Sequence, residues 1–143
     1  MRSVKSSENA SAASDFDVVR STWAAIAQQD LDAVLSVFDP QVRWHGAGDG
    51  ELDEGCRDRD DVLTFLQRAQ AVGVSAELLD LHPAGDHLLA VVQKHVPPDW
   101  GEQPDPHGEL VTVREGRIVE MRVYSTVPDA LAAARGPGST AVG

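Results

Sequence analysis

Residues 107–126 read HGELVTVREGRIVEMRVYST, and they indicate the architecture of the chain most clearly. Two runs rich in apolar residues, 107–114 and 117–126, flank the dipeptide Glu115-Gly116. Such runs, separated by a short turn that contains glycine, are typical of a β-hairpin. We therefore expect an antiparallel pair of strands near the end of the chain.

Two more strand-like runs lie just upstream of this hairpin. They are residues 74–82 and 87–96, and the intervening sequence PAGD (83–86) has the composition of a turn. The proline-rich segment 97–106 then predicts a loop. Four consecutive strands joined in this way favour a single antiparallel sheet.

The N-terminal half instead has the spacing of amphipathic helices. The first predicted helix begins at Ser14 or Asp15, and its apolar residues recur three and four apart on one face: Phe16, Val19, Trp23 and Ile26. A second, short helix is capped by Asp30 and ended by Pro40. A short strand over 42–46 follows it, and a third helix spans about 58–71.

This order of elements predicts an α+β fold. We expect one curved antiparallel sheet, shaped as a cone with a pocket at its open end, packed against the three helices of the N-terminal half. A single domain over 15–134 is expected between a disordered arm, 1–14, and a flexible tail, 135–143. Residues 128–134 are expected to add one last helical turn or two.

Composition excludes several classes of partner. The chain has 12 Lys and Arg against 23 Asp and Glu, a net charge of −11, which disfavours binding to nucleic acid or to anionic membranes. The sequence has no apolar run of about 18 residues and no signal-like segment at its start. The single cysteine, Cys56, excludes an intramolecular disulfide. We expect a cytoplasmic protein.

Three segments of the chain resemble the nuclear transport factor 2-like superfamily. They are QDLDAVLSVFDPQVRW (29–44), Gly55 followed by DDVLTFL (60–66), and REGRIVEMRVY (114–124). The superfamily includes SnoaL-like polyketide cyclases, ketosteroid isomerases and limonene epoxide hydrolases. The resemblance covers about 15–134 and implies the cone-shaped, cystatin-like fold, together with a homodimer formed through the outer face of the sheet.

The resemblance also places the catalytic positions of the isomerases and hydrolases on this sequence. They fall on residues that carry none of the carboxylates and none of the aromatic hydroxyl that those enzymes use: Trp44, Gly46, Gln93, His95 and Val123. Neither isomerase chemistry of that type nor epoxide hydrolysis is therefore expected.

The residues themselves suggest a pocket on the concave face of the sheet. Gln93 and His95 share one face of a strand because alternate residues point the same way, and we expect Trp44 on that face too. His95 is the candidate general acid or base, and Gln93 would orient a carbonyl or hydroxyl group. The alternative is a histidine satisfied by a neighbouring group. The expected ligand-binding residues are Trp23, Trp44, Gln93, Met121 and Val123, although core packing is the simpler interpretation for Trp23.

No metal or cofactor is expected. The five histidines (45, 82, 87, 95 and 107) lack metal-ligand spacing, and the acidic cluster 49–54 lacks the spacing of a calcium-binding loop. The leading hypothesis is a protein that binds a small apolar molecule containing a carbonyl group or a ring. Two alternatives stay open: a SnoaL-like cyclase, isomerase or dehydratase that uses His95, and a dimerisation or assembly domain. Trp100 is expected either as a lid over the cavity or half-buried against the sheet.

Overall fold

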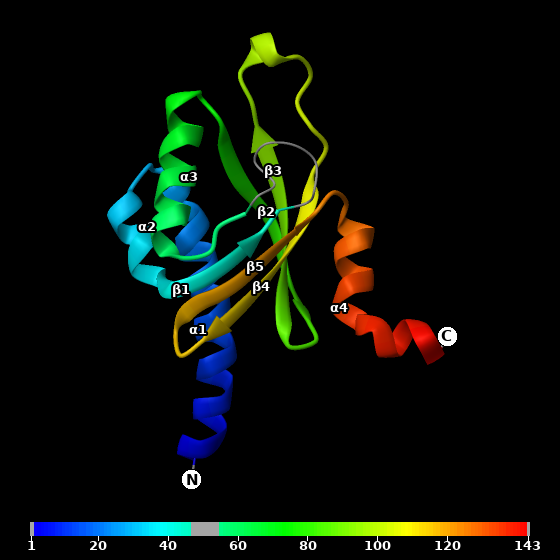
Figure 1. Ribbon diagram of the computed structural model, residues 1–143. Helices are drawn as coiled ribbons and strands as arrows, with labels where there is room; N and C mark the ends of the chain where they lie inside the picture. The colour runs from blue at the N-terminus through cyan, green and yellow to red at the C-terminus, as the bar shows by residue number, and fades with distance from the viewer. Residues whose placement is uncertain (1, 47–54, 143) are drawn as a thin grey trace.

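The computed structural model describes residues 2–46 and 55–142, and the side chains of 15–46 and 55–135. The acidic cluster 49–54 lies outside the described residues. Figure 1 shows the elements in this part of the chain. They are α1 (Arg2–Ala27), α2 (Leu31–Val37), β1 (Phe38–His45), α3 (Arg59–Ala71), β2 (Ser75–Ala84), β3 (His87–His95), the short 3-10 helix η2 (Pro98–Trp100), β4 (His107–Arg114), β5 (Arg117–Tyr124) and α4 (Val127–Val142).

The five strands form one curved sheet in the order β1-β5-β4-β3-β2. The pairs β2–β3, β3–β4 and β4–β5 are antiparallel, as the hairpin pattern predicts. The expected α+β fold is confirmed, but the sheet is mixed, because β1 runs parallel to β5. A crossover through α3 takes the chain from β1, at one edge, to β2, at the other. Because no hairpin joins β1 to β5, no short turn forces these two strands to run antiparallel.

Helices cover both faces of the sheet (Figure 1). The face against α1, α2 and α3, called the inner face here, carries the main apolar core, which includes Phe38, Ala90, Val92, Val111, Ile118 and Met121. The opposite, outer face packs against α4 through a smaller cluster of Ala84, Leu89, Leu110 and Ala130. The expected helical turns over 128–134 are confirmed, and they belong to a longer helix, because α4 runs from Val127 to Val142.

A glycine in β4 allows the close approach of α4. A Cβ atom at Gly108 would lie 2.7 Å from the Cβ atom of Ala130 and 3.3 Å from Cδ1 of Leu89. Both distances are below ordinary van der Waals contact, so only a residue without a side chain lets α4 pack here. The glycine separates His107 from Glu109, the two residues whose side chains face the other way.

The predicted starts of the second and third helices are confirmed, and one predicted helix end is shifted. The first helix begins at Arg2, so its predicted start at Ser14 or Asp15 is wrong. The side chains of Asp30 and Asp58 accept hydrogen bonds from the backbone N–H groups of Ala33, at 3.2 Å, and Asp61, at 2.9 Å. However, α2 ends at Val37, and Pro40 lies inside β1. Because β1 is an edge strand with an irregular register, it tolerates a residue that lacks a backbone donor.

Cys56 forms a short antiparallel bridge with Trp44 at the free edge of β1. The N–H of Trp44 donates to the carbonyl of Cys56 at 2.9 Å, and the N–H of Cys56 donates to the carbonyl of Trp44 at 2.7 Å. The preceding Gly55 has φ of +75°, and a Cβ atom there would collide with the carbonyl oxygen of Trp44. This glycine therefore fixes the backbone of Trp44 at the end of β1.

Both terminal segments of the described chain are helical. Backbone of residues 2–14 belongs to α1, and backbone of 136–142 belongs to α4, where the sequence favours an arm and a tail. The predicted disorder of 1–14 and flexibility of 135–143 stay predictions. The domain limits 15–134 also stay a prediction. None of the helices in the described part of the chain has the length and apolar character needed to cross a membrane.

Candidate functional site

Trp44 lies on the inner face, as expected. It packs against the main core with its ring centroid 6.3 Å from that of Phe38 and 5.2 Å from that of Phe65. These rings come from β1 and α3, so they join the end of the sheet to a helix. The contacts describe an aromatic cluster at the edge of the core.

Gln93 and His95 lie on the outer face, so the prediction that they share a face with Trp44 is wrong. Along β3, Leu88, Ala90 and Val92 belong to the inner core, and strand alternation turns the odd-numbered residues outward. The reason for the error is that β3 has apolar residues on both faces, such as Leu89 and Val91, so its sequence does not identify the inner one.

The two side chains have partners on that face. Nε2 of Gln93 donates to the carbonyl oxygens of Pro104, at 2.7 Å, and Lys94, at 2.9 Å, and so holds the loop after β3. His95 is 47% exposed, and its Nε2 lies 3.0 Å from Oε1 of Glu77. A catalytic role for His95 stays a prediction, without the enclosed site on which it was based.

The other predicted ligand-binding residues are dispersed. Met121 is fully buried in the main core, and Val123 is partly buried next to it on β5. Trp23 is buried on α1, where its ring also borders an open groove beside β2. Trp100 stands on η2 with 55% of its surface exposed, and its role as a lid stays a prediction.

The inner face carries a polar pair that sequence reasoning missed. Val111 belongs to the inner core, so alternation along β4 places Glu109 and His107 on the same face. Nε2 of His107 lies 2.7 Å from Oε2 of Glu109, and the two side chains are 17% and 6% exposed. Glu109 lies between Ala90 of β3 and Val123 of β5.

The second carboxylate oxygen of Glu109 is buried without a partner. Oε1 makes no hydrogen bond with any group in the described part of the chain. An unsatisfied buried polar group costs about 1–3 kcal/mol, and more when it is charged. The pair therefore combines an imidazole that reaches solvent with a deeper carboxylate oxygen that can still accept a hydrogen bond.

One signal in the sequence could have found this pair. In the run His107-Gly-Glu-Leu-Val111-Thr-Val113, the odd positions end in two valines, and two of the three even positions are the small Gly108 and the polar Thr112. Extending that apolar face backwards puts an acid and a histidine on it, two residues apart. From the sequence, His107 was a candidate only as one of five possible metal ligands, and Glu109 was not predicted as a site residue.

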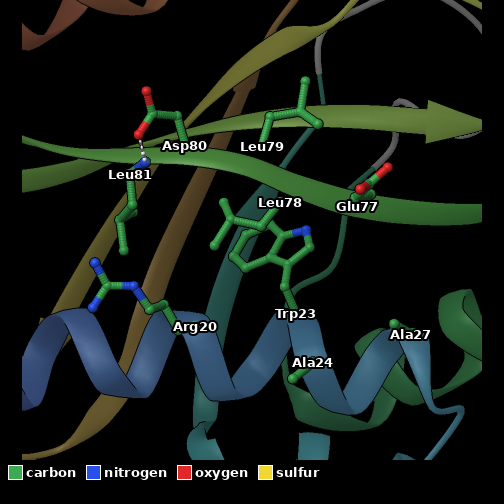
Figure 2. A pocket seen from close by; sticks show the side chains of 9 residues that line it. All are labelled: Arg20, Trp23, Ala24, Ala27, Glu77, Leu78, Leu79, Asp80 and Leu81. Atoms are coloured by element: carbon green, nitrogen blue, oxygen red, sulfur yellow. Dashed lines mark hydrogen bonds between the residues drawn. The ribbon is translucent and has the colours of Figure 1, made fainter.

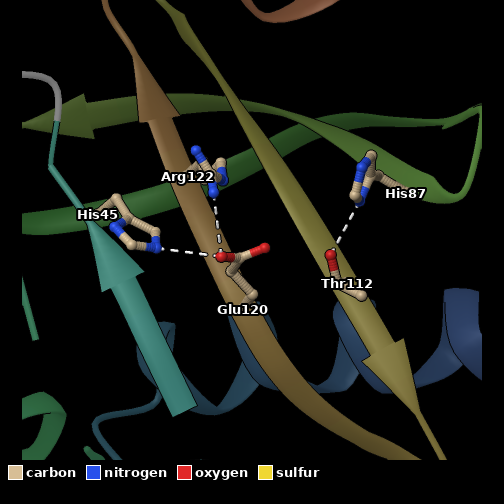
Figure 3. Close-up of polar contacts among 5 residues, drawn as sticks. All are labelled: His45, His87, Thr112, Glu120 and Arg122. Atoms are coloured by element: carbon tan, nitrogen blue, oxygen red, sulfur yellow. Dashed lines mark hydrogen bonds and ion pairs between the residues drawn. The ribbon is translucent and has the colours of Figure 1, made fainter. Parts of the chain in front are cut away.

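The outer face carries a separate set of polar contacts, shown in Figure 3. Oε2 of Glu120 lies 3.1 Å from Nε2 of His45 and 3.3 Å from Nη2 of Arg122, and Nδ1 of His87 lies 2.8 Å from the hydroxyl of Thr112. Burial would raise the pKa of Glu120, but the hydrogen bonds and charges of His45 and Arg122 outweigh it and lower that pKa.

Neither a metal centre nor a reactive thiol is found in the described residues. No three His, Cys, Asp or Glu side chains of this part of the chain are grouped so that they could hold a metal ion. Burial, assisted by the charges of Asp61 and Asp58, raises the pKa of Cys56 to about 11. The thiol is therefore protonated at neutral pH and is a poor nucleophile.

Comparisons with known proteins agree with this architecture. A protein encoded by a soil-derived mobile gene cassette, Bal32a, is 18% identical with a TM-score of 0.67, over 78% of this chain and 88% of that one. A putative polyketide cyclase from Sinorhizobium meliloti is 23% identical with a TM-score of 0.59, over 75% and 93%. A protein with a cystatin-like fold from Xanthomonas campestris is 21% identical with a TM-score of 0.68, over 83% and 95%.

At these identities the structures establish the fold alone. No curated protein matches this chain. The sequence pattern of the SnoaL-like domain matches residues 19–121, which span the chain from α1 to β5. The chain therefore belongs to the SnoaL-like domain family.

Proposed function

We propose that this protein binds a small, largely apolar molecule against the inner face of its sheet, and that Glu109 accepts a hydrogen bond from it. The observation that supports the proposal is the buried Oε1 of Glu109, which has no partner among the described residues. A ligand hydroxyl or N–H group would supply the missing donor. Ligand sites commonly combine apolar walls with a few such convergent polar groups.

The surroundings of Glu109 define the chemistry of the ligand. Ala90 and Val123 flank Glu109 on the neighbouring strands and offer only apolar surface. His107 is nearer to solvent, and an imidazole can donate to a carbonyl oxygen or accept from a hydroxyl. A compact molecule with an apolar ring or chain and one carbonyl or hydroxyl group fits this arrangement.

A second candidate function is acid–base catalysis on such a carbonyl compound. The observation that favours it is the 2.7 Å contact between His107 and Glu109, because a carboxylate held by an imidazole is suited to moving protons. Glu109 would take a proton from the carbon beside the carbonyl group and return it at another position, so no redox change occurs. The similar structure from Sinorhizobium meliloti is a putative polyketide cyclase, which supports a reaction of this class.

His107 and Glu109 are better placed for this role than His95. His95 is half-exposed on the outer face and already paired with Glu77. In contrast, the Glu109 carboxylate is shielded from water, which strengthens its interactions with a bound molecule.

The test compares two carboxylates of the same sheet. The purified protein is screened against small cyclic ketones and phenols by thermal shift and native mass spectrometry. Glu109→Gln should weaken binding of the selected compound about tenfold, because a neutral amide oxygen accepts a weaker hydrogen bond than a carboxylate oxygen. The matched control, Glu120→Gln on the outer face, should bind as the wild type does. Equal affinities for both variants would contradict the proposal.

Catalysis is tested on the same compound. Deuterium exchange at the carbon beside the carbonyl should slow at least 10²-fold in Glu109→Gln if the pair transfers the proton. Binding without exchange in the wild-type protein would leave a non-catalytic binding protein. If no compound binds at all, the assembly-domain alternative is the better account.

The proposal includes a cytoplasmic homodimer. The polar stripe of Glu120, Arg122 and His45 on the outer face, beside α4, is the surface that would meet its copy. Sedimentation velocity at micromolar concentration should give a dimer, and Arg122→Glu should shift it toward monomer. A monomeric wild-type protein would refute this part.

A further inference from the structure

An open groove of about 450 Å³ lies between α1 and the edge strand β2, apart from the His107–Glu109 pair. Figure 2 shows the ring of Trp23 and the side chain of Leu78 meeting at its base, with Leu81 pointing toward the helix. Ala24 and Ala27 form the wall of the helix, and their small side chains leave the space open. The base of the groove is therefore apolar, and its volume is that of a small-molecule site.

One cationic side chain stands in this groove. Arg20 of α1 is 59% exposed, and its guanidinium group lies 5.4 Å from the ring centre of Phe16. Its ion pair with Asp17 has a separation of 3.9 Å and is exposed on both sides, so it contributes little. Most of the donors of this guanidinium group can therefore serve an incoming anion.

The two acids of the groove are directed elsewhere. In Figure 2, Asp80 points away from α1, on the other side of β2 from Leu81. Oδ2 of Asp80 lies 2.9 Å from Nε2 of His82, and Oε1 of Glu77 lies 3.0 Å from Nε2 of His95. Both carboxylates therefore have histidine partners outside the groove, and Arg20 is the cationic group among the residues that line it.

We propose that this groove binds a small amphipathic anion: a flat or extended apolar body rests against Trp23, Leu78 and Leu81, and its carboxylate contacts Arg20. Charge complementarity favours an anion, and the aromatic and aliphatic base favours an apolar body. An added peptide strand along the edge of β2 is the less suitable occupant. The irregular pairing between Leu78 and Asp80, and Pro83 in the same strand, interrupt the ladder that a peptide would need.

The experiment uses the full chain and two matched probes, 2-naphthoate and the uncharged 2-naphthamide. Isothermal titration should show 2-naphthoate binding more tightly than 2-naphthamide. Arg20→Gln should weaken 2-naphthoate about five- to tenfold and leave 2-naphthamide unchanged, since only the charged contact is removed. The matched control is Arg68→Gln, an exposed arginine of α3, which should have no effect.

A second variant tests the location. Ala24 is exposed on α1, so Ala24→Phe should fold normally and fill the groove, and both probes should then lose binding. Glu109→Gln should not change either affinity, which separates this proposal from the inner-face site. The proposal is overturned if 2-naphthoate fails to bind at millimolar concentration, if Ala24→Phe binds it normally, or if Arg20→Gln and Arg68→Gln behave alike.

Discussion

Replacing Glu109 by methionine should stabilise the folded protein. The substitution keeps a side chain of similar length and removes the buried Oε1 atom, which has no partner among the described residues. It also removes the 2.7 Å contact between Oε2 and His107. The first change stabilises the fold and the second destabilises it, so the prediction depends on their relative size.

The magnitudes favour stabilisation. An unsatisfied buried polar atom costs about 1–3 kcal/mol, and more when it belongs to a charged group, while a hydrogen bond to a charged group contributes about 1.5–3 kcal/mol. His107 is 17% exposed and can regain part of its hydration, which reduces the loss. The expected net gain is about 1 kcal/mol. For 143 residues this corresponds to a rise in Tm of about 3 °C.

The assay is urea unfolding followed by circular dichroism, with Thr112→Val as the matched control. Thr112 is the other buried polar residue of β4, and its hydroxyl has a partner 2.8 Å away in His87. That variant should lose about 1 kcal/mol because it removes a satisfied hydrogen bond. If Glu109→Met is destabilised by as much as Thr112→Val, the carboxylate is satisfied in the native protein and the inner-face site loses its support.

Three further outcomes follow from other parts of the structure. Gly108→Ala should destabilise the fold by about 1–3 kcal/mol in chemical denaturation, because the new methyl group overlaps Ala130 of α4; an unchanged midpoint would show that α4 does not pack closely on β4. Cys56, with a pKa of about 11, has roughly one thiolate in a thousand at pH 8, so a disulfide reagent should label it only after unfolding; rapid labelling of the native protein would contradict its burial. The lowered pKa of Glu120 stabilises the fold above about pH 4.5, and this contribution is lost as the pH falls through the folded-state pKa. The difference in free energy of unfolding between the wild type and Glu120→Gln should therefore decrease below pH 4.5. A constant difference would show that the contact with His45 is not electrostatic.

Local chemistry in the sequence predicts most of the fold. The aspartate caps and the Glu115-Gly116 turn act within a few residues, so a single sequence identifies them. The parallel pairing of β1 with β5 depends instead on segments about 75 residues apart, such as His45 and Arg122. No local pattern specifies that pairing, which is why the sheet was expected to be wholly antiparallel.

The candidate site is harder to predict for a related reason. In β3 both faces are covered, one by the main core and the other by α4, so its apolar residues do not alternate. The direction of His95 then depends on tertiary packing. In β4 the alternation is also blurred, because Gly108 and Leu110 face α4 while Glu109 occupies a core position. A polar residue on an apolar face breaks the pattern by which that face is recognised.

That break in the pattern is itself an argument for function. The buried polar side chains of the described residues are Thr22, Thr112 and Glu109. The first two have simple structural roles, because the hydroxyl of Thr22 donates to the carbonyl of Val18 at 2.7 Å and that of Thr112 pairs with His87. Glu109 alone among these three keeps a buried atom without a partner. An apolar residue would serve the core better at that position, so the unpaired carboxylate oxygen supports the proposal that Glu109 meets a hydrogen-bond donor of a ligand.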